Sequence, residues 1–350
     1  MVFALTALGV VVIAVTVLPL IRSGAWWIRI NDFPRLQIAG LAVAVLLACL
    51  LRDEFFSTTA GRLFLSALVL CILYQSYQVF PFTPFARKQV QASTLPREES
   101  RLSLLFANVL MSNRNAPKLR EIIGSVDPDI ILTVEADEWW RQQLENFEQT
   151  HPAVVHQPQD NTYGMLLYSR LPLADPEVRF LVEDDIPSIH GRVRLPCGQE
   201  IDLHCLHPRP PFPTEDDDST ERDAELLIVG KAIKGKTLPV IVLGDLNDVA
   251  WSRTNDLFQN ISGLLDPRVG RGFFNTFHAR WFFLRFPLDH FFHSNHFRLI
   301  ELRRLPYFGS DHFPVFISLS YEAGARTEQE KPAATGDEKE QARERIAKVT

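Results

Sequence analysis

Three stretches without a charged side chain dominate the start of the sequence. They cover residues 2–20, 36–51 and 63–80, and each has about the length that a helix needs to cross a hydrocarbon layer about 30 Å thick. The first stretch lacks the basic start of a cleaved signal peptide, and two more follow it. The pattern therefore predicts about three transmembrane helices within residues 1–80. A hairpin of buried globular helices is the alternative.

The pattern changes after residue 80. Prolines and mixed charges over 81–100 indicate a linker. Over 101–320, short β-branched runs alternate with helical periodicity, which predicts a mixed α/β domain. Residues 321–350 are rich in Glu, Lys, Arg, Ala and Gln and contain almost no large apolar residue. Such a segment cannot bury a core, so we expect a disordered charged tail.

Within the α/β region, helices are expected over 116–125, 137–146 and 220–234, and strands over 102–108, 129–135 and 239–244 and near residues 153, 165, 178, 192 and 201. Several apolar runs stop at a polar residue, which places that residue at the rim of a sheet, where loops collect functional groups. These residues are Asn108, Glu135, Asp245 and Asn247, and the pair Asp311-His312 is expected at the end of another strand.

Asp289 lies inside the very apolar run from Phe286 to Phe292. An unpaired charge there would be costly. We therefore expect Asp289 to have a partner, and a histidine is the natural one.

The order Asn108, Glu135, His207, Asp245-x-Asn247, Asp289, Ser310-Asp311-His312 resembles that of the endonuclease/exonuclease/phosphatase (DNase I-like) superfamily. The resemblance covers residues 101–320, and these separate segments occur in the family's order. It implies a two-sheet, four-layer α/β sandwich and a hydrolase acting on phosphate ester bonds. With the apolar N-terminal region, the chain resembles a membrane-anchored bacterial member.

The resemblance also implies a metal and a division of roles. Anionic oxygens repel the nucleophile, and a hard divalent cation reduces that repulsion. Mg²⁺ is expected, with Mn²⁺ as the alternative, held by Asn108, Glu135 and Asp311. His312 would be the base, or else a donor to the phosphate, with its tautomer held by Asp289. Asp245 and Asn247 would orient the water, and His207 would contact the phosphate or assist the leaving group.

Two further residues are candidates for substrate contact. Tyr163 and Arg170 bracket the run GMLLYS at 164–169, which is also found in the family. The alternative is that Arg170 belongs to a simple Ser-Arg-x-Pro turn.

Charge bears on the substrate. The first 89 residues hold seven basic and three acidic side chains, so 29 of the 36 basic and 39 of the 42 acidic residues remain, giving the rest of the chain a net charge of −10. Nonspecific DNA binding depends on many Lys and Arg contacts to phosphates, and the sequence has no basic run. Nucleic acid, a phospholipid headgroup and a small phosphorylated metabolite all stay open. A catalytically inactive membrane-bound binding module is the alternative to an enzyme.

The segment 272–286 is dense in aromatic residues. Two core strands would account for most of these aromatic residues. The alternative is an aromatic hairpin that faces the bilayer.

Basic residues near the spans predict the orientation. Arg22, Arg29 and Arg35 follow the first span and Arg87, Lys88 and Arg97 follow the third, against Arg52 and Arg62 between the second and third. The positive-inside rule therefore predicts a multi-pass protein, in a bacterial inner membrane, with a cytoplasmic catalytic domain. The oligomeric state stays open.

Overall fold

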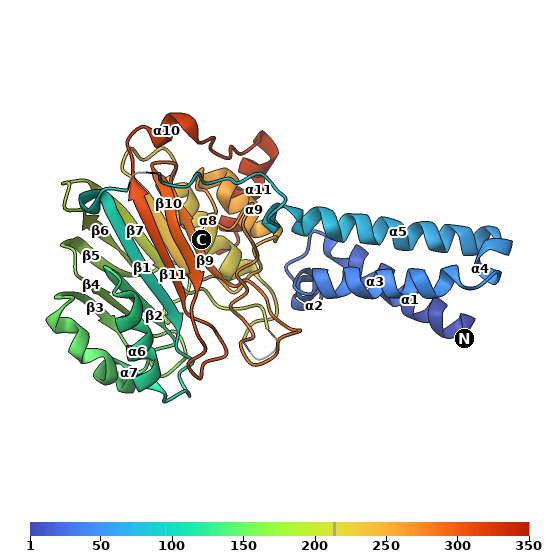
Figure 1. Cartoon of the computed structure of the whole chain (residues 1–350), viewed down its shortest axis with the longest axis horizontal. Helices are drawn as coiled ribbons and strands as arrows, with labels where there is room; N and C mark the ends of the chain where they lie inside the picture. The colour runs from blue at the N-terminus through green and yellow to red at the C-terminus, as the bar shows by residue number, and fades with distance from the viewer. Residues whose placement is uncertain (95, 213–214, 350) are drawn as a thin grey trace.

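The computed structural model describes residues 1–94, 96–212 and 215–349. A long helical bundle projects from one side of an α/β domain (Figure 1). The N-terminus lies at the far end of the bundle, and the chain enters the α/β domain from its near end.

The bundle consists of α1 (Val2–Val17), α3 (Arg35–Leu50) and α5 (Thr59–Val79), joined by the short helices α2 (Trp26–Arg29) and α4 (Glu54–Ser57). Its core is apolar, and many large apolar side chains face outward. Two segments, Val2–Leu20 and Thr59–Phe82, are long and apolar enough to cross a membrane. The region of α3 qualifies only when combined with Trp26–Asp32, which is bent from it by 73°.

The α/β domain contains two sheets. The first has six strands in the order β10-β11-β1-β2-β4-β3 and the second has five in the order β5-β6-β7-β8-β9. Their bounds are β1 (Arg101–Asn108), β2 (Ile130–Val134), β3 (Ala153–Gln157), β4 (Met165–Ser169), β5 (Leu173–Phe180), β6 (Pro187–Arg194), β7 (Glu200–Leu206), β8 (Val240–Asp245), β9 (Asp289–His293), β10 (Phe297–Arg304) and β11 (Val315–Tyr321).

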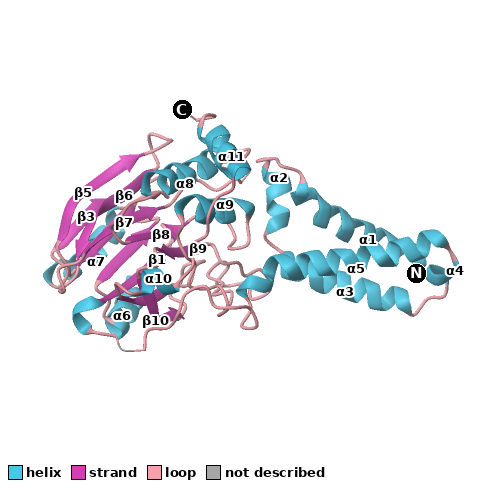
Figure 2. Cartoon of the chain, turned by 90° about the horizontal axis from the view of Figure 1, so that it is seen from above, coloured by secondary structure: helices cyan, strands magenta, loops and turns pink. Residues whose placement is uncertain are grey.

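Helices cover the outer faces of both sheets. On the first sheet, α6 (Ala116–Val126) and α7 (Glu138–Leu144) pack through an apolar cluster that includes Trp140. On the second, α8 (Thr220–Ile233) packs with α9 (Arg253–Ser262) through a cluster that includes Phe258. The inner faces share the main core. Figure 2 shows these layers from above, and they confirm the predicted four-layer sandwich.

Strand direction brings the polar strand ends together. β1 is parallel to β2, and β7 is parallel to β8, so Asn108 and the end of β8 lie at carboxyl ends. β11 is antiparallel to β1 and β9 is antiparallel to β8. His312 therefore precedes its strand and Asp289 begins its strand, which corrects the expectation that Asp311-His312 follows a strand.

The predicted disorder of the tail is wrong for the described residues. The chain forms α10 (Ala325–Glu328) and α11 (Gly336–Ile346), and α11 begins with a capping box between Thr335 and Glu338. Ala342 is buried in a cluster with Leu227 and Ile261. Glu338 also accepts from Asn260 of α9, and Arg345 pairs with Asp223 of α8. Apolar and polar contacts together dock this charged helix onto α8 and α9.

The linker is also docked. Leu299 of β10 donates from its amide to the carbonyl of Gln91 (2.9 Å) and accepts from the amide of Ser93 (2.8 Å). Val90 is fully buried in the main core. The mixed-charge segment therefore adds a short edge contact to the first sheet.

The aromatic segment 272–286 forms a loop rather than two core strands. Its two arms meet at an isolated bridge between Phe277 and Phe286. At its turn, the side chains of Trp281, Phe282 and Phe283 are half or more exposed. Gln37, near the start of α3, donates from Nε2 to the carbonyl of Phe283 at 2.6 Å, so the exposed turn lies beside the near end of the bundle.

Candidate functional site

Asn108 joins two carboxylates at the rim between the sheets. Its Nδ2 donates to Oε1 of Glu135 (2.6 Å) and to Oδ2 of Asp245 (3.1 Å). Its Oδ1 accepts from the amide of Leu110 at 3.0 Å. The side chain therefore presents N–H groups, and not its oxygen, to the two acids.

Glu135 follows the last residue of β2 with a φ of 56°, a region that side chains rarely adopt. Burial raises the pKa of Glu135 to about 7, and the charges of Asp311 and Asp245 add to this effect. The hydrogen bond from Asn108 and the charge of His312 oppose it. Negative charge is thus concentrated here without full compensation.

The end of β8 explains the Gly-Asp-x-Asn motif. Gly244 has a φ of 147°, and a Cβ there would lie 1.8 Å from the carbonyl oxygen of Leu206. Only glycine fits at this close approach. Asp245 accepts at Oδ1 from the amide of Asn247 (2.9 Å), and the Asn247 side chain donates to the carbonyl of Pro208 (2.9 Å).

The predicted histidine partner of Asp289 is His312. Nδ1 of His312 lies 3.1 Å from Oδ1 of Asp289, and Nε2 lies 3.4 Å from Oδ2 of Asp245. All three side chains are buried. Burial alone would lower the pKa of His312, but the charges of Asp289 and Asp245 outweigh it and raise the pKa to about 10. Burial raises the pKa of Asp245.

Ser310 has a positional role that the motif alone did not reveal. Its Oγ donates to the carbonyl of Asn108 (2.8 Å) and accepts from the amide of His312 (3.0 Å). It thereby ties β1 to the start of β11. The half-buried Asp311 between them is held through its carbonyl, which accepts from the amide of Ala279 at 2.6 Å.

His207 lies against Tyr163, with 5.4 Å between ring centroids. His207 is buried, and its Nδ1 has no hydrogen-bond partner among the described residues. Burial lowers the pKa of His207 to about 4, so the ring is neutral near pH 7. The Tyr163 hydroxyl donates to Glu215 at 3.0 Å.

Arg170 lies elsewhere. It follows β4, whose other end is next to Tyr163, and its amide donates to the carbonyl of Asp129 before β2. Its guanidinium pairs with Asp127. Because Glu135 lies at the opposite end of β2, Arg170 is at the wrong edge of the sheet for the site. We therefore do not retain it as a substrate-binding residue.

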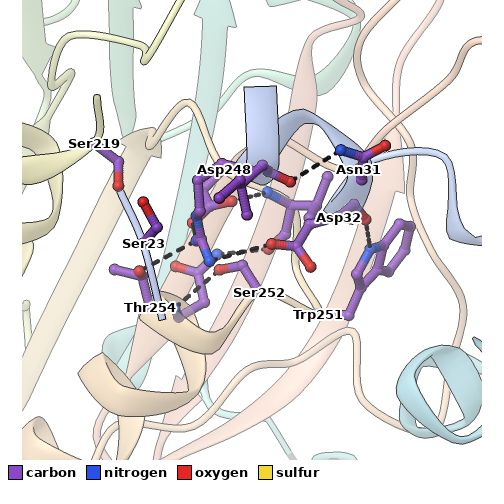
Figure 3. A network of polar contacts seen from close by, with 12 residues as sticks. Ser23, Asn31, Asp32, Ser219, Asp248, Trp251, Ser252 and Thr254 are labelled. Atoms are coloured by element: carbon purple, nitrogen blue, oxygen red, sulfur yellow. Dashed lines mark hydrogen bonds and ion pairs between the residues drawn. The ribbon is translucent and has the colours of Figure 1, made fainter. Parts of the chain in front are cut away.

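The loop after Asp245 is held by a buried ionic network that the sequence did not reveal (Figure 3). Arg222 donates to the carbonyl of Asn247 at 2.7 Å and lies 3.1 Å from Asp248. Arg29 of α2 lies 3.2 Å from the same carboxylate and also pairs with Asp32 at 3.1 Å. Neither Arg222, within an acidic helix, nor Arg29, between two apolar segments, carried a local sequence signal for this role.

The donor set fits a divalent cation. Glu135 and Asp311 contribute carboxylate oxygens of the kind that Mg²⁺ prefers. A second candidate group is Asp245, Asp289 and His312, whose ligand atoms all lie within 4.8 Å of one another. However, Nδ1 of His312 is hydrogen-bonded to Asp289, and Nε2 forms an ion pair with Asp245 at 3.4 Å. We therefore interpret the trio as an acid–histidine relay, in which Nε2 is able to donate to a substrate.

The fold is shared with several solved structures. The human Nocturnin catalytic domain with bound sulfate matches with a TM-score of 0.52 and 14% identity, covering 65% of this chain and 96% of that one. D. rerio TDP2 complexed with a single-strand DNA product matches with a TM-score of 0.51 and 16% identity, covering 63% and 99%. An endonuclease/exonuclease/phosphatase family protein from Bacteroides thetaiotaomicron matches with a TM-score of 0.51 and 20% identity, covering 66% and 98%.

At the level of sequence, no curated protein matches significantly. The family model described as the endonuclease/exonuclease/phosphatase family matches residues 105–312, more than half of the chain. This span includes the strand ends and connecting segments that supply Asn108, Glu135, Asp245, Asp289 and His312. The chain therefore belongs to the endonuclease/exonuclease/phosphatase family of phosphate-ester hydrolases.

Proposed function

We propose that the protein is a membrane-anchored, divalent-metal-dependent phosphodiesterase. One observation carries the proposal: a continuous series of contacts runs from Asp289 through His312, Asp245 and Asn108 to Glu135. It combines a metal-ligand carboxylate with a positioned acid–base pair at one rim, which is what water attack on a phosphate ester requires.

Glu135 and Asp311 would hold the metal. When bound, a divalent cation would neutralise phosphate charge and lower the pKa of a water molecule. Asn108 donates to Glu135, and its own oxygen is engaged by Leu110. We therefore assign Asn108 to holding the carboxylates in place rather than to direct ligation.

The histidine acts as a donor in this scheme. With its pKa raised to about 10 by the neighbouring acids, although burial opposes this, His312 is a cation near pH 7 and cannot accept the proton of a water molecule. Asp245 is the carboxylate in contact with it and takes that proton, while His312 donates to a phosphoryl oxygen. Asn247 and the neutral His207 contact the phosphate from the other side.

A phosphodiester presented at a membrane surface suits the molecule best. The net charge of −10 outside the first 89 residues disfavours an extended nucleic-acid track. The exposed turn Trp281–Phe283 lies beside the near end of the bundle, and aromatic side chains of this kind favour the membrane interface. Its loop also reaches the site, because Phe277 lies against His312 with 5.1 Å between ring centroids.

An inactive binding module on the same fold is the second candidate. Such a module would not need a histidine held between two buried acids, because burying charged side chains costs stability even when they are paired. The intact relay therefore favours the enzyme.

The test uses the full chain in detergent micelles with Mg²⁺, and it compares supercoiled plasmid, an abasic-site oligonucleotide and phospholipid vesicles. Glu135→Gln is expected to reduce turnover at least about 100-fold, and chelation followed by Mg²⁺ addition should abolish and then restore it. Glu138→Gln removes an exposed carboxylate three residues away that pairs with Arg141 and should retain activity. A wild-type protein inert with every metal and substrate would support the binding module instead.

A further inference from the structure

A small cavity lies where the anchor meets the α/β domain, and its lining shares only Arg29 of the ionic network with the site described above. It encloses about 70 Å³, several times the roughly 10–15 Å³ that one water molecule needs. Its walls come from the segment after α1 and from the ends of α8, α9 and α11. We call it the basic junction pocket, after the side chains of Arg22, Arg29, Arg253, Arg345 and Lys348 that line it.

The acidic groups near these cations are already engaged. Asp223, the one acidic residue among the described pocket-lining residues, lies 2.9 Å from both Arg222 and Arg345. Arg29 is paired with Asp32 and Asp248. Two of the five basic residues are thus neutralised within the protein.

The other three are not. Among the residues that the structure describes, the side chains of Arg22, Arg253 and Lys348 make no hydrogen bond or ion pair. Arg253 is only partly exposed. Burial, followed by the charges of Arg22 and Arg345, lowers the pKa of Arg253. Three cations around the cavity therefore have no ion-pair partner among the described residues.

A helix end also lies on the wall of the pocket. The 14-residue helix α8 begins at Thr220, on the wall of the pocket, and its N-cap Ser219 provides no side-chain cap. Ser219 Oγ donates instead to Asp223. The amide of Thr220 donates to Asp218 at 2.7 Å, and the first turn carries Glu221 and Asp223. The end of α8 is therefore already supplied with acids, and the preference for an anion rests on the three unpaired cations.

The surroundings of the pocket select the kind of anion. Arg22 directly follows the apolar segment Val2–Leu20, which is able to cross a membrane. Leu20 and Ile21 are 52% and 53% exposed, and Ile21 also lines the pocket. The cavity is therefore polar inside and continues into an apolar rim that leads onto the anchor. Free phosphate would use only the polar part, whereas a lipid would use both.

We propose that the basic junction pocket binds the phosphate of an anionic phospholipid headgroup, with the acyl chains lying along Leu20 and Ile21. The site is separate from the hydrolytic centre and does not depend on the proposed activity. A lipid bound there would neutralise Arg22, Arg253 and Lys348 and would fasten α1 to α8, α9 and α11.

The test measures thermal unfolding of the full chain in detergent micelles at fixed ionic strength, in the Glu135→Gln background so that no lipid is consumed. Phosphatidylglycerol, phosphatidylcholine and inorganic phosphate are added in parallel. At saturation, phosphatidylglycerol is expected to raise the Tm by about 5 °C, with a much smaller effect of the other two. Arg253→Gln and Arg22→Gln should each weaken the apparent affinity about tenfold.

The matched control is Arg87→Gln. Arg87 is exposed just after α5, at the same end of the bundle, but outside the pocket. Within the described part of the chain, the exposed side chain of Arg22 makes no hydrogen bond or ion pair, so Arg22→Gln remains informative if Arg253→Gln fails to fold. Equal stabilisation by inorganic phosphate would overturn the lipid assignment. Equal effects of phosphatidylglycerol and phosphatidylcholine, or equal losses in Arg87→Gln and the two pocket variants, would overturn the site.

Discussion

At the scale of single residues, the site depends on backbone conformations that side chains seldom adopt. Glu135 and Asn247 have φ values of 56° and 51°, and each lies just beyond a strand. Such turns cost free energy and persist where packing enforces them. Residue types and order were enough to predict these groups, because carboxylates and amides interrupting apolar runs are visible in a sequence. The orientation of these side chains is not visible in a sequence. The sequence therefore did not reveal that Asn108 donates to two carboxylates.

Asp289→Asn should lower kcat by about 10²- to 10⁴-fold with little change in KM, because the amide no longer fixes the charge and tautomer of His312. Removing this acid also lowers the pKa of His312 from about 10. The alkaline limb of the rate profile should therefore move to lower pH. Rates measured from pH 6 to 10 check this, and an unchanged profile would show that Asp289 does not act on His312.

Glu225 is buried in α8, and its Oε1 has no hydrogen-bond partner among the described residues. Burial, with the charge of Glu183 adding to it, raises the pKa of Glu225 from 4.5 to about 8. The folded state therefore holds a proton that the unfolded state releases above pH 4.5, and stability falls as pH rises from 4.5 to 8.

Glu225→Gln should remove this loss. The variant is expected to match the wild type near pH 4 and to be more stable by about 3 kcal/mol at pH 7. Denaturant unfolding at several pH values measures the difference, with the exposed Glu344→Gln as control. A constant difference across the range would contradict the assignment.

At the scale of elements, strands and helices of the α/β domain could be predicted where apolar residues form a clear run or period, as in β1 and α6. The strand predicted over 102–108 is β1, and the helix predicted over 116–125 is α6. The errors lie where partners far along the chain decide the structure. The helix of Ala342 is docked by apolar residues of α8 and α9 and by the ion pair of Arg345 with Asp223, and the arms of the aromatic loop 272–286 pair at a single bridge.

Ala342→Asp should detach α11, because it places a charge against Leu227, Leu257 and Ile261. A loss of about 2–4 kcal/mol is expected, together with protease cleavage around residues 330–336. Glu344→Ala changes the exposed face of the same helix and should behave like the wild type. Equal stability of the two variants would restore the interpretation of a dispensable tail.

At the scale of the whole molecule, the bundle implies a topology. α1 approaches the α/β domain, α3 leads away from it and α5 returns, so the N-terminus lies at the far end (Figure 1). The apolar outer faces of these helices suit lipid contact. If all three helices cross a membrane, the N-terminus and the α/β domain lie on opposite sides.

Reporter fusions at the two ends of the chain test this arrangement. We expect the C-terminal fusion to report the cytoplasm, as the basic residues flanking the spans predict, and the N-terminal fusion to report the opposite side. Reporters on the same side would mean that α3 does not cross. Both fusions should remain in the membrane fraction after washing with high salt.

The contacts between the helical bundle and the α/β domain limit how this protein could be rearranged during evolution. Val79 and Phe82, at the end of the last bundle helix, are buried with Trp251 and Leu288 of the α/β domain, and Arg29 is paired with Asp248 in the loop after Asp245. If another helical segment replaced the bundle, Asp248 would lose one of its arginine partners, and these apolar side chains would become exposed. The two parts are therefore expected to be inherited together, and fusion to an unrelated membrane segment should succeed only if the partners of Asp248 and Trp251 are transferred with it.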